Sequence, residues 1–284
     1  MPTQAPSPSR ALAVEPAPWE MIVFDDVSLA FEENRVLEGI SFRLAHGETK
    51  ILLGVAGTGK TLILKLALGL VKPDSGRIYV LGREVTAMEE EDLFELRREI
   101  GMVFQESALF DSLTVKENVG YRLIEEGIAD DEVERRVLEA LRFVELEGTI
   151  DMFPSELSGG MRRRVAIARA IITQPEVLLY DSPTAGLDPI TSHTIITLIL
   201  RLRDTQGVTS IMATQRLQDA FGLANFRFDQ AQNRVVRISP AALAARNGQP
   251  STTFLFLREG KVYFEGGPQA LLESPDAYLK KFLV

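Results

Sequence analysis

The segment at residues 54–61, with the letters GVAGTGKT, constrains this chain more than any other feature, because it fits the pattern G-x-x-x-x-G-K-[ST]. It follows the short apolar stretch 49–53, which is typical of a β-strand. It also opens a segment in which Leu62, Leu66 and Leu70 recur at helical spacing. A strand, a glycine-rich turn and a helix in this order are the context that a phosphate-binding loop requires. The alternative is a glycine-rich turn that begins a helix by chance, and the matching flanks argue against it.

In a phosphate-binding loop the glycines let backbone N–H groups wrap around phosphate oxygens, and the helix N-terminus adds a favourable partial charge. We expect Lys60 to reach the β- and γ-phosphates of a nucleotide and the Thr61 hydroxyl to ligate Mg²⁺. The residues that we expect to contact the nucleotide here are Gly54, Val55, Ala56, Gly57, Thr58, Gly59, Lys60, Thr61 and Leu62.

A second apolar strand, at residues 177–180, ends in the carboxylate of Asp181. The carboxyl ends of parallel strands face the ligand crevice of an open α/β sheet, so Asp181 is expected to hold Mg²⁺ through water. An aspartate that only caps the following turn is the alternative. Ser182 comes next, where a carboxylate would act as general base on an attacking water, and serine has no base strength near neutral pH.

Strand-like and helical patterns alternate along the chain of 284 residues, which predicts a parallel sheet covered by helices. The net charge of −9 argues against a general nucleic-acid binder, and the lack of cysteine excludes disulfides and thiolate metal sites. No apolar run approaches the roughly 20 residues that span a bilayer, and no signal peptide opens the chain. We therefore expect a cytoplasmic protein whose membrane role, if any, comes through a partner, with a disordered proline-rich tail at residues 1–18.

The letters LSGGM at residues 157–161, followed by three arginines, lie about 100 residues beyond the phosphate loop. Together with the two motifs above, they resemble the ATPase subunits of ABC transporters over residues 21–223 and the terminal hairpin. The resemblance implies a P-loop NTPase of the α/β class, with a RecA-like parallel-sheet core and an N-terminal antiparallel β subdomain. It also implies a single ATP-binding domain at residues 20–284, with a helical signature subdomain at about 106–165 and an insert and hairpin at about 224–284.

The same resemblance assigns roles to further residues. Phe31 aligns with the aromatic residue that stacks on adenine, and Gln105 with the Q-loop glutamine that touches Mg²⁺ and couples to the membrane subunit. Asp188 matches the D-loop. The loop of Ser158, Gly159 and Gly160 matches the signature loop that closes on the γ-phosphate held by the other subunit. The implied assembly is a homodimer that holds ATP and Mg²⁺ between two copies of the chain.

Arg163 and Arg164 follow the signature loop, and we interpret both as solvated charges on a helix. Residues 105–115, with Glu117, Asn118 and Val119, look like the ATPase of Mce- or Mla-type lipid transporters, as do Met161 and residues 188–191. This indicates a permease and an Mce-type lipid-binding protein as partners, with a generic importer or exporter ATPase as the alternative. Leu109, Phe110 and Leu113 are expected to form a groove for a permease helix, or in part to be core.

Two positions depart from the family pattern. Ser182 replaces the usual catalytic glutamate, and Gln215 replaces the switch histidine. Glutamine donates a hydrogen bond but carries no charge and shuttles no proton. We therefore predict strong ATP binding with slow hydrolysis, or alternatively a nucleotide-gated structural subunit. A DNA-repair or translation ATPase is a weaker alternative, because such proteins carry a long coiled coil or a second ATP-binding domain. Residues 226–253 are interpreted as a surface elaboration, with a regulatory insert as the alternative.

Overall fold

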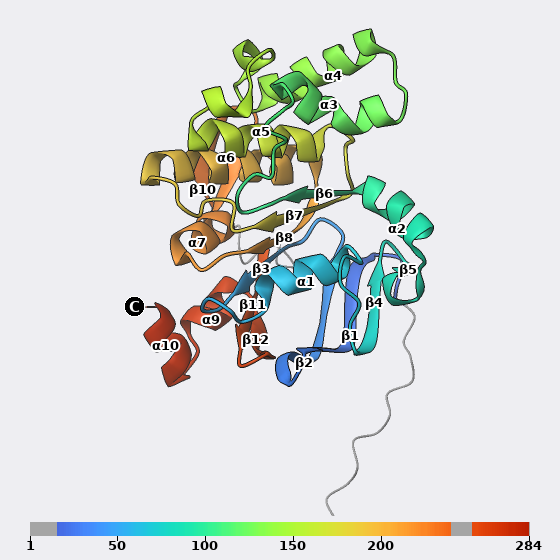
Figure 1. The fold of residues 1–284 in the computed structure, drawn as a ribbon. Coiled ribbons are helices and arrows are strands. Elements are labelled where there is room, and N and C mark those ends of the chain that lie inside the picture. Colours follow the sequence, from blue (N-terminus) through green and yellow to red (C-terminus); the bar gives the residue numbers. More distant parts are fainter. Residues whose placement is uncertain (1–15, 240–251, 284) are drawn as a thin grey trace, which may run out of the picture.

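A six-stranded sheet forms the centre of the computed structural model, which describes residues 16–239 and 252–283 (Figure 1). The strand order is β12-β11-β3-β8-β7-β6; β12 runs antiparallel to its neighbour, and the other strands are parallel. The strands are β3 Thr49–Leu53, β6 Ile100–Val103, β7 Val177–Asp181, β8 Thr209–Ala213, β11 Thr252–Arg258 and β12 Lys261–Gly266. The predicted parallel sheet is present, although the sequence did not indicate β6.

Both faces of this sheet are buried, because successive residues of each strand contribute to different hydrophobic clusters. In β7, Leu178 and Tyr180 pack with residues of α5, α6 and α7, whereas Leu179 packs with residues of α1. These helices are α1 Lys60–Ala67, α5 Gly159–Ile171, α6 Pro189–Gln206 and α7 Leu217–Asn225. The phosphate-loop strand β3 lies near the middle of the sheet, so its carboxyl end is held from both sides.

An antiparallel sheet covers the α1 side, with the strand order β2-β1-β4-β5. Its strands are β1 Glu20–Phe31, β2 Asn34–Ala45, β4 Ser75–Val80 and β5 Arg83–Glu84. Phe24 and Phe42 stack across β1 and β2 with ring centroids 4.6 Å apart, and both are buried. The N-terminal antiparallel region implied by the resemblance is therefore present as a separate sheet.

The remaining helices of the middle segment lie at the opposite end of the molecule from the antiparallel sheet (Figure 1). They are α3 Val115–Glu125 and α4 Asp130–Phe143, with α2 Glu90–Leu96 near β5. Val133, Val137, Leu141 and Val144 are all buried, as their spacing predicted. Single 3₁₀ turns occur at Val85–Ala87, Arg97–Glu99, Glu147–Thr149 and Pro154–Glu156. The limits of a helical subdomain at 106–165 stay a prediction.

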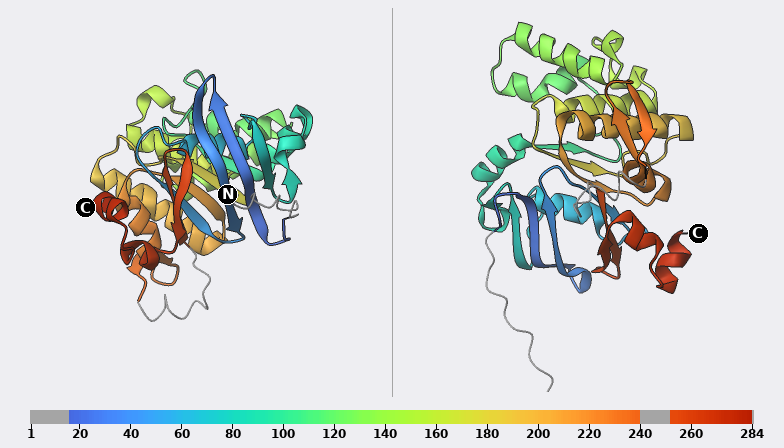
Figure 2. Two further views of the ribbon diagram at one scale, coloured as in Figure 1. Left: turned by 90° about the horizontal axis from the view of Figure 1, so that it is seen from below. Right: turned by 180° about the vertical axis from the view of Figure 1, so that it is seen from behind.

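The C-terminal part contains two strand pairs. β9 Phe226–Asp229 and β10 Arg234–Arg237 form a small sheet beside α6, seen from behind in Figure 2. The predicted hairpin is present as β11 and β12, but β11 also pairs in parallel with β3, which the sequence did not suggest. The predicted pair of terminal helices is observed as α9 Pro268–Leu272 and α10 Ala277–Leu283. Residues 240–251 of the predicted insert lie outside the described residues.

Two expectations from the sequence need correction or limits. The prediction that Leu62, Leu66 and Leu70 form the apolar stripe of α1 is wrong in part, because Leu62 is half-buried and Leu70 is 49% exposed. Ile63 and Leu64 are buried in the core instead. Most of the predicted tail lies outside the described residues, and within its described end the Ala17 N–H donates to Glu20 Oε2 at 2.8 Å. Of the helices described, none has the length and apolar character needed to cross a membrane.

Candidate functional site

The loop between β3 and α1 has a backbone shape that its glycines make possible. Gly54 and Gly59 have φ angles of 146° and 92°, which other residues rarely adopt. A Cβ atom on Gly54 would lie 2.6 Å from the Leu257 carbonyl oxygen, and one on Gly59 would lie 2.5 Å from Leu37 Cδ2. The motif therefore meets both a conformational and a packing requirement at these two positions.

Lys60 is buried at the start of α1 and points back over the loop. Its Nζ donates to the carbonyl oxygens of Gly54 at 2.9 Å and Val55 at 2.7 Å, and to Thr58 Oγ1 at 3.3 Å. Burial lowers the pKa of Lys60, and the negative charge of Asp181 partly offsets this effect. The ammonium group is thus held inside the loop, where a phosphate would supply the counter-charge.

The loop also has backbone N–H groups that are free to donate hydrogen bonds to an anion. Among the described residues, no protein acceptor is bonded to the backbone N–H groups from residue 57 to residue 61, and the first recorded bond of the helix runs from Ile63 N to Gly59 O at 3.0 Å. Unpaired N–H groups at a helix start, beside a buried lysine, form a cradle for phosphate oxygens. The residues present therefore fit the phosphates of a nucleotide.

Asp181 lies at the carboxyl end of β7 and contacts the loop directly. The Thr61 hydroxyl donates to Asp181 Oδ2 at 2.9 Å and lies 3.1 Å from Oδ1. Asp181 therefore faces the phosphate loop and not the turn that follows it, which rules against the simple turn-capping interpretation. A hydroxyl and a carboxylate side by side are hard oxygen donors of the kind that Mg²⁺ prefers, so this pair fits the metal.

Ser182 and Gln215 lie at neighbouring strand ends beside Asp181. Asp181 pairs with Ala213 in the sheet, and the Ser182 N–H donates to the Ala213 carbonyl at 2.9 Å. Ser182 has a left-handed φ of 48° and its Oγ lies 3.4 Å from Asp181 Oδ1, whereas Gln215 is exposed. The structure thus brings both altered positions to the edge that carries the phosphate loop.

Two acidic residues, Glu176 before β7 and Asp204 near the end of α6, do not replace the missing carboxylate. Glu176 precedes β7, at the end of the strand opposite to Asp181. Asp204 is bound by Arg203, with Nε to Oδ1 at 2.8 Å, and accepts from Phe228 N at 2.7 Å. Neither residue is at the edge of the sheet where the phosphate loop lies.

The signature and D-loop residues form a second cluster. Ser158 caps α5 by accepting from Met161 N at 3.2 Å, and Asp188 caps α6 by accepting from Ile190 N and Thr191 N at 3.0 Å. A Cβ atom on Gly160 would lie 2.4 Å from Thr191 Cγ2, so the two helix starts touch. The hydrogen bonds to Thr191 hold the pKa of Asp188 below its usual value.

Two further predicted residues lie on the surface. Phe31 ends β1 with 49% of its surface exposed, which leaves its ring free to stack on a planar group. Gln105 is exposed in the loop that follows β6. Among the described residues, no recorded hydrogen bond joins Gln105 or Phe31 to the phosphate loop, so their roles stay predictions.

We expected Arg163 and Arg164 to be solvated charges on a helix, and the structure corrects this, because both donate to backbone carbonyls. Arg163 is 5% exposed, and its Nη1 donates to the Phe104 carbonyl at 2.7 Å. Arg164 is half-buried and its Nη1 donates to the Val144 carbonyl at 3.0 Å. A run of three arginines is typical of a solvated helix face. Only the tertiary contact with residue 104 reveals that Arg163 is buried.

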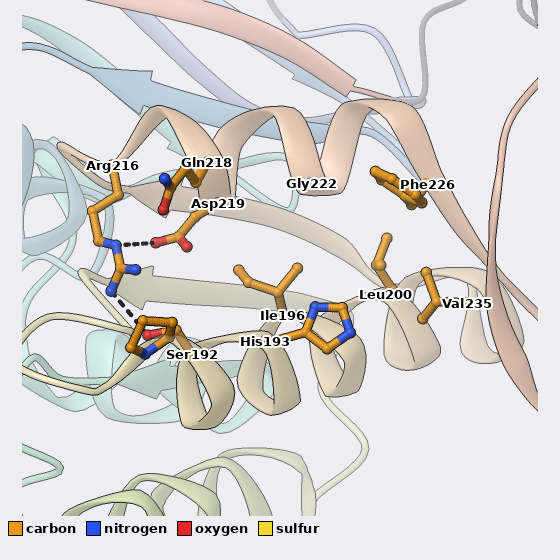
Figure 3. Close-up of a pocket in the computed structure, with 11 residues that line it drawn as sticks. Ser192, His193, Ile196, Leu200, Arg216, Gln218, Asp219, Gly222, Phe226 and Val235 are labelled. Carbon is orange, nitrogen blue, oxygen red and sulfur yellow. Dashed lines mark hydrogen bonds and ion pairs between the residues drawn. The ribbon is translucent and has the colours of Figure 1, made fainter.

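Sequence reasoning also missed a polar network between α6 and α7, beside a cavity of about 370 Å³ (Figure 3). Arg216 Nη1 donates to Ser192 Oγ at 2.9 Å and to the Thr184 carbonyl at 3.1 Å, and Arg216 Nε lies 3.6 Å from Asp219 Oδ2. Asp219 also accepts from the Thr184 hydroxyl. Burial raises the pKa of Asp219, and its bonds to Thr184 and Arg216 offset part of that rise. The network links the segments after β7 and β8.

A glycine-rich loop with a buried lysine, followed by a helix and faced by an aspartate from a neighbouring parallel strand, defines a nucleotide-binding domain of the P-loop class. A family model described as "ABC transporter" matches residues 37–185, which is more than half of the chain. The chain belongs to the ABC transporter family. It is an ABC-type ATPase, and its cofactors are ATP and Mg²⁺.

Three relatives illustrate the range of the family. The chain is 37% identical over 270 residues to the protein TRIGALACTOSYLDIACYLGLYCEROL 3, chloroplastic, of Arabidopsis thaliana, covering 90% of this chain and 71% of that one. It is 37% identical to the Fe(3+) ions import ATP-binding protein FbpC of Escherichia coli O157:H7, covering 81% and 64%. It is 36% identical to the methionine import ATP-binding protein MetN of Carboxydothermus hydrogenoformans, covering 70% and 60%. The chain thus spans less than two thirds of the last two relatives.

Solved structures agree on the fold. The dimeric ATP-binding cassette MJ0796, in a post-hydrolysis state with ADP and Pi, superposes with a TM-score of 0.72 at 27% identity, covering 87% of this chain and 98% of that one. The protein cbiO1 of Clostridium perfringens, part of the transporter complex cbiONQ, gives a TM-score of 0.73 at 26% identity, covering 93% and 95%. The predicted ABC ATPase fold, with its parallel core, antiparallel sheet and helical elements, is confirmed.

Proposed function

We propose that this chain is the energy-coupling ATPase subunit of a lipid transporter, and that two copies hold two ATP molecules between them. The contact of Thr61 with Asp181, together with the burial of Lys60 inside the loop, is the observation that supports the ATP site. The location of Ser158 and Asp188 in a separate cluster supports a dimer, because the signature loop is then available to a second copy. The solved structure of the similar cassette MJ0796 is a dimer, which agrees with this arrangement.

Each residue of the site has a distinct task in this proposal. Lys60 and the free N–H groups of the loop bind the phosphates, while Thr61 and Asp181, with Gln105 from the neighbouring loop, hold the metal ion that screens phosphate charge. Phe31 stacks on the adenine ring. Ser158 and Gly160 of a second copy complete the phosphate contacts.

Hydrolysis is the weak step, because the position after Asp181 holds a serine. Ser182 Oγ hydrogen-bonds the neighbouring carboxylate and takes no proton from water near neutral pH. The loss of a general base lowers a rate by roughly 10²–10⁴-fold. Gln215 is exposed at the next strand end and supplies a neutral amide in place of an imidazole. The chain therefore binds ATP tightly and hydrolyses it slowly. If hydrolysis is negligible, the chain is a nucleotide-gated structural subunit.

Single-turnover hydrolysis with protein in excess of ATP tests this step. We expect Ser182→Glu to raise the rate at least about a hundredfold, because it restores a carboxylate beside Asp181. Gln218→Glu is the matched control, since it adds the same charge at an exposed position of α7. If the unmodified chain hydrolyses ATP as fast as Ser182→Glu, another group already serves as base and the proposal of slow turnover is wrong.

The lipid substrate rests on the resemblance of residues 105–119 to lipid-transporter ATPases. It is supported by the Arabidopsis relative, which is named after a lipid, trigalactosyldiacylglycerol. That alignment covers 90% of this chain, compared with 81% for the iron relative and 70% for the methionine relative. A permease and an Mce-type lipid-binding protein are the partners, and no nucleic acid is involved. The chain then lies on the cytoplasmic face of the membrane, attached through the permease.

The substrate is tested by purifying the tagged chain with its permease and reconstituting the complex in vesicles. We expect ATP hydrolysis to respond to phospholipid in the vesicle and to the Mce-type partner. A response to methionine or ferric iron in the absence of any response to lipid would exclude the lipid assignment while leaving the ATPase itself intact.

A further inference from the structure

The loop after β6 has a backbone that needs outside support. Ser107 and Ala108 are consecutive residues with left-handed φ angles of 67° and 47°, and neither is a glycine. Such conformations cost free energy for residues with a Cβ atom and persist where surrounding contacts hold them. This loop carries Gln105 and leads to Phe110, which is 46% exposed.

Two arginines of the signature helix α5 supply those contacts. Arg163 Nη1 donates to the Phe104 carbonyl at 2.7 Å. Arg169 donates from Nη2 to the Ser107 carbonyl at 2.8 Å and from Nη1 to the Ala108 carbonyl at 2.7 Å. The residues on both sides of Gln105 are therefore bound to the helix that begins at the signature loop.

Burying the guanidinium groups of these two arginines costs free energy, which a purely structural role does not require. Burial lowers the pKa of both guanidinium groups, and for Arg163 the charges of Asp181 and Glu106 offset part of the effect. Among the described residues, neither arginine forms a salt bridge, and Arg163 Nε is buried with no hydrogen-bond partner. An apolar side chain commonly stabilises such a site as well or better, so the charges indicate a requirement beyond stability.

We propose that Arg163 and Arg169 are positioning residues that tie the Gln105 loop to the signature helix. When α5 moves toward the nucleotide of a second copy, the bonds to residues 104, 107 and 108 carry Gln105 with it. The state of the signature loop is thereby transmitted to the metal site by two side chains. This inference concerns the ATPase site and does not depend on which substrate is transported.

A spin label in the loop tests the connection without any nucleotide. The chain has no cysteine, so Glu106→Cys provides a single labelling site on an exposed residue. We expect the label to become markedly more mobile when Arg163→Met or Arg169→Met is added. Arg164→Met is the matched control, because Arg164 lies on the same helix and bonds instead to the Val144 and Glu145 carbonyls. Unchanged mobility in the double variant Arg163→Met, Arg169→Met would overturn the proposal.

The Mg²⁺ dependence of ATP binding separates a positioning role from a structural one. We expect Arg163→Met to raise the half-saturating Mg²⁺ concentration at least about tenfold, as the loss of one charged hydrogen bond implies, with Arg163→Lys restoring part of it. If Gln105→Ala shifts the Mg²⁺ dependence but Arg163→Met leaves it unchanged while the label becomes more mobile, the proposal is also overturned.

The Mg²⁺ measurement rests on the proposed metal contact of Gln105, so Gln105→Ala is run beside it. If Gln105→Ala leaves the Mg²⁺ dependence unchanged, that metal contact is wrong, and the label alone decides the role of the arginines. If Arg163→Met fails to fold, Arg169→Lys at the half-buried position replaces it in both measurements, with a smaller shift expected.

Discussion

The buried side chain of Asn118 organises the turn between the Gln105 loop and α3, and its removal gives a measurable prediction. Its Oδ1 accepts from Phe110 N at 2.7 Å. Its Nδ2 lies 3.0 Å from each of three carbonyl oxygens, those of Phe110, Leu113 and Thr114. Asn118 is fully buried, so Asn118→Ala leaves the Phe110 N–H and the Leu113 carbonyl without a partner. The carbonyls of Phe110 and Thr114 each keep one backbone bond, from Leu113 N and from residue 118 N.

The size of the effect follows from the number of bonds that the amide makes well. An amide nitrogen has two hydrogens, so it serves two of the three carbonyls strongly, and the oxygen adds a third bond. At about 1 kcal/mol for each hydrogen bond, Asn118→Ala should lower the free energy of unfolding by about 3 kcal/mol. For a chain of this size, that loss corresponds to a fall in Tm of roughly 6 °C.

Urea unfolding of the full chain measures this change, with the m-value expected to stay constant. Thr114→Ala is the internal comparison, because it removes an exposed cap, in which the hydroxyl accepts from Glu117 N at 3.2 Å and donates to Glu117 Oε2 at 2.9 Å, and it should cost about 1 kcal/mol. If Asn118→Ala costs no more than Thr114→Ala, the amide is not the centre of this turn. ATP binding should survive both variants, since neither residue contacts the phosphate loop.

Three further predictions test other parts of the structure. Gly101→Ala places a Cβ atom 2.4 Å from a backbone carbonyl oxygen of α5 and should cost more than about 2 kcal/mol in urea unfolding, whereas Gly148→Ala, with open space around it, should be nearly neutral. Lys60→Met should weaken ATP binding about a hundredfold in calorimetry, because a charged hydrogen bond is worth up to about 3 kcal/mol, and Lys65→Met on the same helix should not. Two arginines of α4 lower the pKa of Glu132 to about 2, which an NMR titration should reproduce. Because this pKa is lower in the folded state, the associated stability is present above the unfolded pKa of about 4.3 and is lost as the pH falls toward about 2.

Local patterns were sufficient for much of the fold. The strand before the phosphate loop, the strand that ends in Asp181 and the buried face of α4 follow from residues that are close together in sequence. β6 escaped notice because its four residues, IGMV, are too short to show a period and include a glycine that packs against α5. The parallel pairing of Thr252 with Thr49 joins segments about 200 residues apart, and no local signal reports it.

The candidate site also contains residues that the sequence could place and residues that it could not. The glycine-rich loop, Asp181 and the altered position 182 could be placed from sequence because a strand end dictates where each of them lies. The environment of Arg163 could not, since a charged helix position is solvated or buried according to what packs against it. The network around Arg216 was missed for the same reason, because its partners come from three separate segments.

The position of β11 has a consequence for the order in which this protein matures on the ribosome. The first glycine of the phosphate loop packs against the carbonyl of Leu257, and β3 has β11 as one of its two neighbours. Synthesis at about 5–20 residues per second separates these segments by roughly 10–40 s. During that interval the nascent loop lacks the β11 side of its site, so we expect that a chain under synthesis does not yet hold nucleotide. A translation product that stops before residue 252 would lack that side permanently and could not compete with complete subunits for ATP.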